Sequence, residues 1–309
     1  MKITLESSPD RFHFPFRIIG YAGRYDTLSD CDFIDDTHIV CADRQMARLY
    51  LIQFDLEHDT YTIIDTATCI CNNKPFHFEL ISIKSANMQN PYITIYAVSY
   101  TNELFSCNIV YNKFTKFTTM VVNPADNYHG VLALEDGSVY VTNMKQPTIT
   151  QFNPKNGYKH TIKCSRGVRM KDVIVIDDPY IVALSSDRGP INGSKTADGT
   201  VQPINKPYDS HVILYNRYTG QHVCVHTLEK TQIDGCVYKA PFCYVTCTDV
   251  SGVGYILRLS IDLVARTFTD PVYIPCAGFP HGISIYNNML AFTSYATSSL
   301  YIHNLSALV

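Results

Sequence analysis

The chain has 309 residues, of which 46% are hydrophobic, so it carries enough apolar material for a packed core. Its 25 basic and 28 acidic residues give a formal net charge of −3 without a lysine or arginine cluster, which argues against nucleic acid as a partner. No apolar run approaches the roughly 18 residues that span a bilayer, and the N-terminus lacks a signal-peptide core. We therefore expect a soluble, cytoplasmic protein with no membrane partner.

Eleven cysteines are present, an odd number in a long chain without an export signal. Cys243 and Cys247 lie on one predicted strand, where four residues separate them by about 13 Å, too far for a disulfide. The thiols are expected to be free and mostly buried.

A short hairpin turn recurs six times along the chain, each time between two runs of β-forming residues. The copies fall roughly 40 to 60 residues apart, close to the spacing of β-propeller blades. They are Phe54-Asp55, Tyr111-Asn112, Phe152-Asn153, Tyr215-Asn216, Ile261-Asp262 and His303-Asn304. The recurrence predicts an all-β, six-bladed β-propeller with four-stranded antiparallel blades, folded as a single domain and expected to be monomeric.

In chain order, the predicted blades cover about 30–69, 77–122, 129–164, 171–228, 234–275 and 281–309. The last blade is one strand short, because the chain stops five residues after Asn304. Residues 14–23, FPFRIIGYAG, have strand composition and precede the first blade. We expect them to close the ring as the outer strand of blade six, since an unpaired strand edge promotes aggregation.

One segment interrupts the repeat. Residues 187–210 lie between the second and third predicted strands of blade four and are rich in Gly, Pro, Asn, Asp and Ser. This composition indicates a long surface loop. It can serve as a lid or partner-binding loop, or be a tolerated solvated insertion.

The first strand of each blade lines the central channel of a propeller, so aligning these strands indicates what surrounds the channel. Polar and ionisable residues dominate the aligned positions. The aligned pairs are Ser29-Asp30, Phe78-Glu79, His129-Gly130, Lys171-Asp172, Asp234-Gly235 and His281-Gly282. His129 and His281 are three blades apart, so they should face each other across the axis.

Two chemistries suit this set of residues. His129 and His281, with Asp30, Glu79 and Asp234, could hold a divalent metal, and their mixed nitrogen and oxygen ligands favour Zn²⁺ or a similar ion over Ca²⁺. Alternatively, one histidine could act as a general base near neutral pH. A purely structural role, with channel residues that bind only water, is the competing interpretation.

Two blades resemble known families. Residues 280–286, PHGISIY, resemble the PHGIS strand of the paraoxonase/arylesterase family, whose histidine serves the active site. His129-Gly130 with LALEDGSVYVTN resembles the blades of NHL-repeat and virginiamycin-lyase proteins and of gluconolactonase-like proteins. Each match covers about 25 residues. The resemblance implies a catalytic role for His281, whereas His129 is added by geometry alone.

The chain also departs from those families. The paraoxonase and gluconolactonase groups hold Ca²⁺ with Glu, Asn and Asp at the inner strand ends, and no Asn occupies an aligned start here. Histidines of the virginiamycin-type lyases lie on neighbouring blades, whereas His129 and His281 should be opposite. A calcium hydrolase is therefore disfavoured.

No phosphate-binding loop, GxSxG elbow or HExxH motif is present, which disfavours nucleotide chemistry. The sequence supports a small-molecule hydrolase (esterase- or lactonase-like) or lyase with its site in the channel. The alternative is a non-catalytic scaffold that binds a protein partner through a propeller face or the 187–210 loop.

Overall fold

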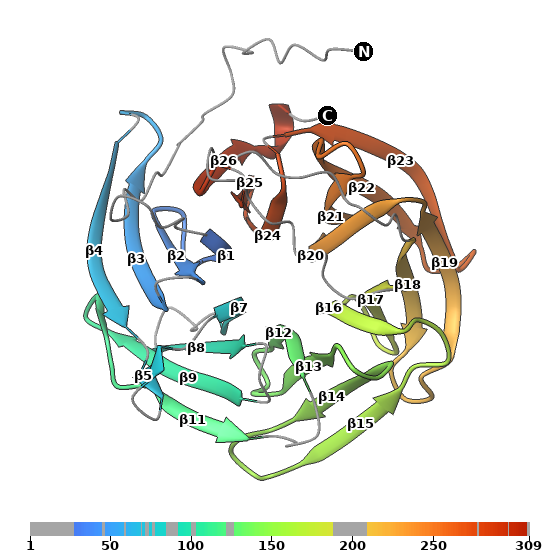
Figure 1. The fold of residues 1–309 in the computed structure, drawn as a ribbon, viewed down its shortest axis with the longest axis horizontal. Coiled ribbons are helices and arrows are strands. Elements are labelled where there is room, and N and C mark those ends of the chain that lie inside the picture. The colour runs from blue at the N-terminus through green and yellow to red at the C-terminus, as the bar shows by residue number, and fades with distance from the viewer. Residues whose placement is uncertain are drawn as a thin grey trace.

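The computed structural model describes residues 28–44, 47–58, 60–68, 70–71, 74–75, 78–84, 92–99, 103–121, 127–187, 209–276, 278–295 and 297–307. Antiparallel sheets succeed one another around a central axis, and the innermost strands β1, β7, β12, β16, β20 and β24 surround that axis (Figure 1). The fold is an all-β, six-bladed propeller, as the sequence predicts.

Each blade is one sheet, with its first strand innermost. Blade one contains β1 (Leu28–Phe33), β2 (His38–Asp43), β3 (Arg48–Asp55) and β4 (Thr60–Thr68). Blade two contains β7 (Phe78–Lys84), β8 (Tyr92–Ser99) and β9 (Glu103–Val110), against which both β10 (Lys113–Phe114) and β11 (Thr118–Val121) pair. Blade three contains β12 (Tyr128–Ala133), β13 (Val139–Asn143), β14 (Thr148–Phe152) and β15 (Lys159–Lys163).

The second half of the ring follows the same plan. Blade four contains β16 (Arg169–Val175), β17 (Tyr180–Ser186), β18 (Ser210–Asn216) and β19 (His222–Leu228). Blade five contains β20 (Thr231–Lys239), β21 (Phe242–Asp249), β22 (Gly254–Asp262) and β23 (Thr267–Pro275). Blade six contains β24 (Pro280–Tyr286), β25 (Met289–Ser294) and β26 (Ser299–Asn304). A small hairpin of β5 (Ile70–Cys71) and β6 (Lys74–Pro75) and a 3₁₀ turn, Leu305–Ala307, complete the described elements.

Two predicted features fall outside the described residues. They are the segment 14–23, expected to complete blade six, and the interior of the 187–210 loop. At the base of that loop, the Asp187 N–H donates to the Asp209 carbonyl at 3.1 Å. The ring closure and the role of the loop stay predictions.

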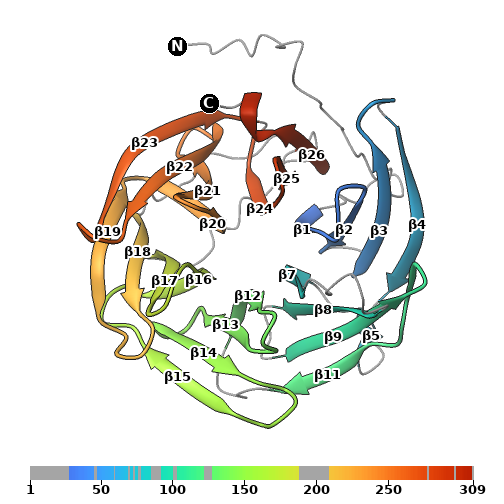
Figure 2. The ribbon, with the colours of Figure 1, turned by 180° about the vertical axis from the view of Figure 1, so that it is seen from behind.

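The hydrophobic core lies between the blades. Six clusters of buried apolar side chains are found among the described residues, and each joins two neighbouring blades. The cluster of Leu28, Tyr50, Ala291 and Leu300 packs blade one against blade six, so core contacts continue around the whole ring. Figure 2 shows these two blades side by side. Burial decreases outward: β12 is almost wholly buried, whereas β15 in the same blade is mostly exposed.

All nine cysteines whose side chains are described are free, and seven of them are buried. The prediction of free, mostly buried thiols is confirmed for these nine. Within the described ranges, the structure contains no helix long and apolar enough to cross a membrane.

The first strands share an irregularity at the aligned polar positions. Each one shifts register against its second strand, for example between Tyr128 and Val131 and between Pro280 and Ile283. Such bulges insert an extra residue and redirect the side chains around it.

Glycines at these bulges let neighbouring blades approach closely. A Cβ atom at Gly282 would lie 1.8 Å from Asp30 Oδ1 and 2.4 Å from the Asp30 Cα. A Cβ atom at Gly130 would lie 2.6 Å from both Asp172 Oδ1 and the Lys171 carbonyl oxygen. These contacts involve backbone of the next blade and cannot be relieved by rotating a side chain.

Substitution of Gly282 by Ala is therefore expected to lower the free energy of unfolding by about 3 kcal/mol or more, because the new methyl group overlaps blade one. Gly252→Ala is the control: Gly252 has φ +83° with nothing within 4 Å, so only the backbone conformation is penalised, at about 1 kcal/mol. Urea denaturation of both variants makes the comparison. Equal losses would show that the inter-blade contact is not tight.

Candidate functional site

The channel brings together three of the residues that the sequence selects. His129 on β12 and His281 on β24 lie on opposite blades, with ring centroids 5.9 Å apart. Asp234 on β20 lies beside both: its Oδ1 is 3.9 Å from His129 Nε2 and 3.8 Å from His281 Nε2. The three potential ligand atoms all lie within 4.8 Å of one another. This buried His129–Asp234–His281 group could hold a metal ion.

Backbone carbonyls fix the orientation of both imidazoles. His129 Nδ1 lies 2.9 Å from the Lys171 carbonyl oxygen, and His281 Nδ1 lies 2.6 Å from the Ser29 carbonyl oxygen. A carbonyl oxygen only accepts hydrogen bonds, so Nδ1 is the protonated nitrogen in each ring. In the neutral rings, Nε2 therefore carries the lone pair, and in both it is turned toward Asp234.

Stacking also supports His281. Its ring lies on Tyr295 with centroids 4.2 Å apart, and Tyr295 in turn stacks on Phe279 at 5.5 Å. The imidazole is therefore held both through its ring edge and on its face.

Sequence reasoning missed Lys171 as a member of this group. Its ammonium lies 2.9 Å from Asp234 Oδ1, and the two side chains are only 1% and 2% exposed. Gln232 donates from Nε2 to the other carboxylate oxygen of Asp234 at 2.7 Å. The sequence did contain a sign of this role: Lys171 is the single Lys or Arg among the aligned channel positions, three blades from the carboxylates of blade one.

The local charges explain the protonation states. Burial raises the pKa of Asp234, but the Lys171 ammonium, followed by the two imidazoles, lowers it by more, so the net pKa lies below its usual value. Burial lowers the pKa of His281 to about 4 against the attraction of Asp234. Burial and the Lys171 charge also hold the pKa of His129 well below its usual value. At neutral pH the group contains one ammonium, one carboxylate and two neutral imidazoles.

The other two predicted ligands are Asp30 and Glu79, and no described oxygen atom of either belongs to this group. Asp30 is buried on β1, where its Oδ1 accepts the Cys31 N–H at 2.9 Å and lies against Gly282. Glu79 is on β7, but its side chain lies outside the described residues.

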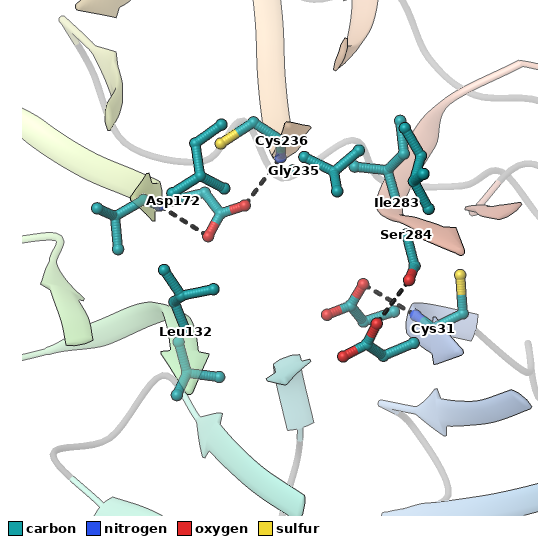
Figure 3. Close-up of a pocket in the computed structure, with 14 residues that line it drawn as sticks. Cys31, Leu132, Asp172, Gly235, Cys236, Ile283 and Ser284 are labelled. Atoms are coloured by element: carbon teal, nitrogen blue, oxygen red, sulfur yellow. Dashed lines mark hydrogen bonds between the residues drawn. The ribbon is translucent and has the colours of Figure 1, made fainter. Parts of the chain in front are cut away.

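Asp30 instead lines a cavity further along the first strands. The cavity has a volume of about 110 Å³ and is formed by blades one, three, four, five and six. Asp172 reaches it from β16, opposite Cys31 and Ser284 (Figure 3). Asp172 accepts the N–H groups of Val173 and Cys236 at 2.9 and 2.8 Å. Burial nevertheless raises the pKa of Asp172 to about 7.

Comparisons with known proteins identify the fold class but no family. No family model and no curated protein matches the chain. Among solved structures, it is similar to the PQQ-bound aldose sugar dehydrogenase from Streptomyces coelicolor, with TM-score 0.62 and 10% identity over 94% of this chain and 97% of that one. Streptogramin B lyase gives 0.55 and 9% over 94% and 96%, and the WD40 repeats of RRP9 give 0.58 and 11% over 96% and 98%.

Identities this low establish the β-propeller fold alone, and the neighbours include both enzymes and a WD40 propeller. The class of protein is therefore settled, while the function has to be argued from the site.

The Lys171–Asp234 pair gives a testable stability prediction. Lys171→Met should lower the free energy of unfolding by about 3–5 kcal/mol, because it leaves a buried carboxylate without its cation. Adding Asp234→Asn should recover part of that loss. Lys113→Met is the control: its 3.3 Å pair with Asp65 is exposed at the lysine, so the cost should stay below about 1 kcal/mol. Additive losses in the Lys171/Asp234 double-mutant cycle would contradict the coupling.

Asp172 gives a pH-dependent prediction. Its folded pKa of about 7 exceeds the unfolded value, so the native state binds the extra proton between about pH 4 and 7. The stability from this proton is present at low pH and is lost as pH rises through 7. Asp172→Asn removes this titration. The free energy of unfolding of the variant, relative to that of the wild type, should therefore increase from pH 5 to pH 8. The variant Asp36→Asn, at an exposed aspartate, is the control in the same denaturant titrations.

Proposed function

We propose that this protein is a propeller-type enzyme, a hydrolase or lyase acting on a small molecule, with the His129–Asp234–His281–Lys171 group as its reactive centre. One observation carries the proposal: two neutral imidazoles, each fixed through Nδ1 to a backbone carbonyl, direct Nε2 toward the same buried ion pair. Convergent titratable groups with displaced pKa values are characteristic of catalytic sites.

The arrangement suits acid–base chemistry. A neutral Nε2 of His281 or His129 can accept a proton from water, as hydrolysis requires, or from a carbon acid, as elimination requires. Asp234 stabilises the imidazolium that results. The Lys171 ammonium supplies a fixed positive charge for an oxyanion that develops in the transition state.

The same ligand set supports a metal-dependent form of this function. Two histidine nitrogens and one carboxylate suit Zn²⁺ or a similar ion. In both histidines the second ring nitrogen, Nδ1, donates its N–H to a backbone carbonyl. Asp234 accepts a hydrogen bond from Gln232, and metal ligands usually have such outer contacts. Lys171 opposes a metal, since its charge already neutralises Asp234. A bound divalent ion would therefore have to displace or deprotonate this ammonium.

A non-catalytic scaffold is the second candidate, and burial favours it. All four side chains of the group are 2% exposed or less, and the apo group is already electrically neutral. In that case the group would join blades three to six at the axis, and a protein partner would bind a propeller face.

His281→Ala separates these functions. Assayed on a panel of esters, lactones and lyase substrates, the variant should lose about 10²- to 10⁴-fold in kcat, as expected when a general base is removed. Thermal unfolding monitored by circular dichroism should show a folded variant. His58→Ala, at an exposed histidine that contacts Asp55, is the matched control and should retain full activity.

Elemental analysis of the purified protein, with and without chelator, accompanies the assay. Zinc that is present in the wild type and lost in the His281→Ala variant would support the metal-dependent form. A wild-type protein that turns over nothing and retains no metal, or a His281→Ala variant that is unfolded or fully active, would favour the scaffold.

A further inference from the structure

The cavity lined by Asp30, Asp32 and Asp172 has no role in the function proposed above. It is separated from the histidine group by the first-strand bulges, at which Gly235 follows Asp234 and Gly282 follows His281. Its volume of about 110 Å³ is of the same order as cavities that accept a benzene-sized ligand. It is therefore large enough for an organic molecule.

The lining residues include partly exposed side chains toward the C-terminal ends of the first strands. Burial decreases in that direction on several blades: Asp30 is buried and Asp32 half-buried, and Cys236 is buried whereas Val237 is half-buried. A ligand that enters from this face does not have to pass the histidine group.

Its lining combines negative charge with an apolar wall. Three of the fourteen lining residues are aspartates, and none of the fourteen is Lys, Arg or His. Seven other lining residues have branched aliphatic side chains: Val131, Leu132, Val173, Ile174, Val237, Ile283 and Ile285. The lining therefore suits a cation that carries an alkyl chain.

The carboxylates occupy opposite sides of the cavity. Asp172 belongs to blade four, and Asp30 and Asp32 belong to blade one, three blades away. Figure 3 shows Asp172 facing Cys31 and Ser284 across an open centre. Among the described residues, the only group of three potential ligands within 4.8 Å of one another is the histidine group. The three aspartates are therefore too dispersed to enclose one inorganic ion.

We propose that this cavity binds a short alkyl diamine, with one ammonium at Asp172 and the other at Asp30 and Asp32. The methylene chain lies along the aliphatic wall, and each ammonium has three N–H donors for carboxylate oxygens. Asp172 already accepts two backbone N–H groups, which fix its carboxylate toward the cavity. The Ser284 hydroxyl donates to Asp32 Oδ1 at 2.5 Å and fixes the opposite side in the same way.

Isothermal titration calorimetry with putrescine tests this site, with n-butylamine as the single-charge analogue and Mg²⁺ as the inorganic cation. Putrescine should bind the wild type saturably with one site, and n-butylamine should bind at least about tenfold more weakly, because one charge-assisted contact is lost. Asp172→Asn and Asp32→Asn should each weaken putrescine binding by about tenfold or more. The exposed Asp36→Asn variant is the matched control and should bind as the wild type does.

Circular dichroism melts establish that each variant is folded. If Asp172→Asn does not fold, the half-buried Asp32→Asn decides the question. No saturable putrescine binding, equal binding by n-butylamine or Mg²⁺, or unchanged affinity in the folded carboxylate variants would overturn the proposal. The readout is binding rather than turnover, so this result is independent of the reaction proposed for the histidine group.

Discussion

The close approach of neighbouring first strands is the constraint on which the rest of the structure depends. At Gly282 and Gly130 the next blade occupies the space of a Cβ atom. Threonines on second strands complete the contact: Thr142 Oγ1 accepts the Gly130 N–H and donates to the Lys171 carbonyl, and Thr246 makes the same bridge from Gly235 to His281. These short contacts narrow the channel and force its polar side chains together without solvent.

Burial of those side chains dictates their charges. A carboxylate without a partner would be too costly in the channel, so Asp234 is accompanied by the Lys171 ammonium and its pKa is lowered. The described partners of Asp172 are backbone N–H groups and the Cys236 thiol rather than a cation, and its pKa rises to about 7. Two buried aspartates of neighbouring blades thus have pKa values shifted in opposite directions, because the Lys171 ammonium lies beside Asp234 whereas burial dominates at Asp172.

The sequence predicts the architecture well because each blade repeats a local signal. The recurrent hairpins at Phe152-Asn153 and Tyr215-Asn216 coincide with the ends of β14 and β18. The spacing of His129 and His281 likewise fixes their blades. The direction of the side chains around the channel was harder to predict, because the alternation of a strand reverses at a bulge. Asp30 and Asp234 are aligned to within one residue, yet Asp30 lines the cavity and Asp234 lies in the histidine group. The ion pair between Lys171 and Asp234 could not be predicted either, because 63 residues separate them in the sequence.

The two levels of the channel are electrostatically coupled despite their separation by the bulges. Burial is the main reason that the pKa of Asp172 is raised, and the Asp234 carboxylate adds to it, so a change in the charge around Asp234 also affects the pKa of Asp172. By linkage the influence is reciprocal: a cation bound beside Asp172 makes the channel more favourable for negative charge and less favourable for an imidazolium. The cavity and the histidine group are therefore separate sites, and the closely spaced first strands let the charge of one contribute to the electrostatics of the other.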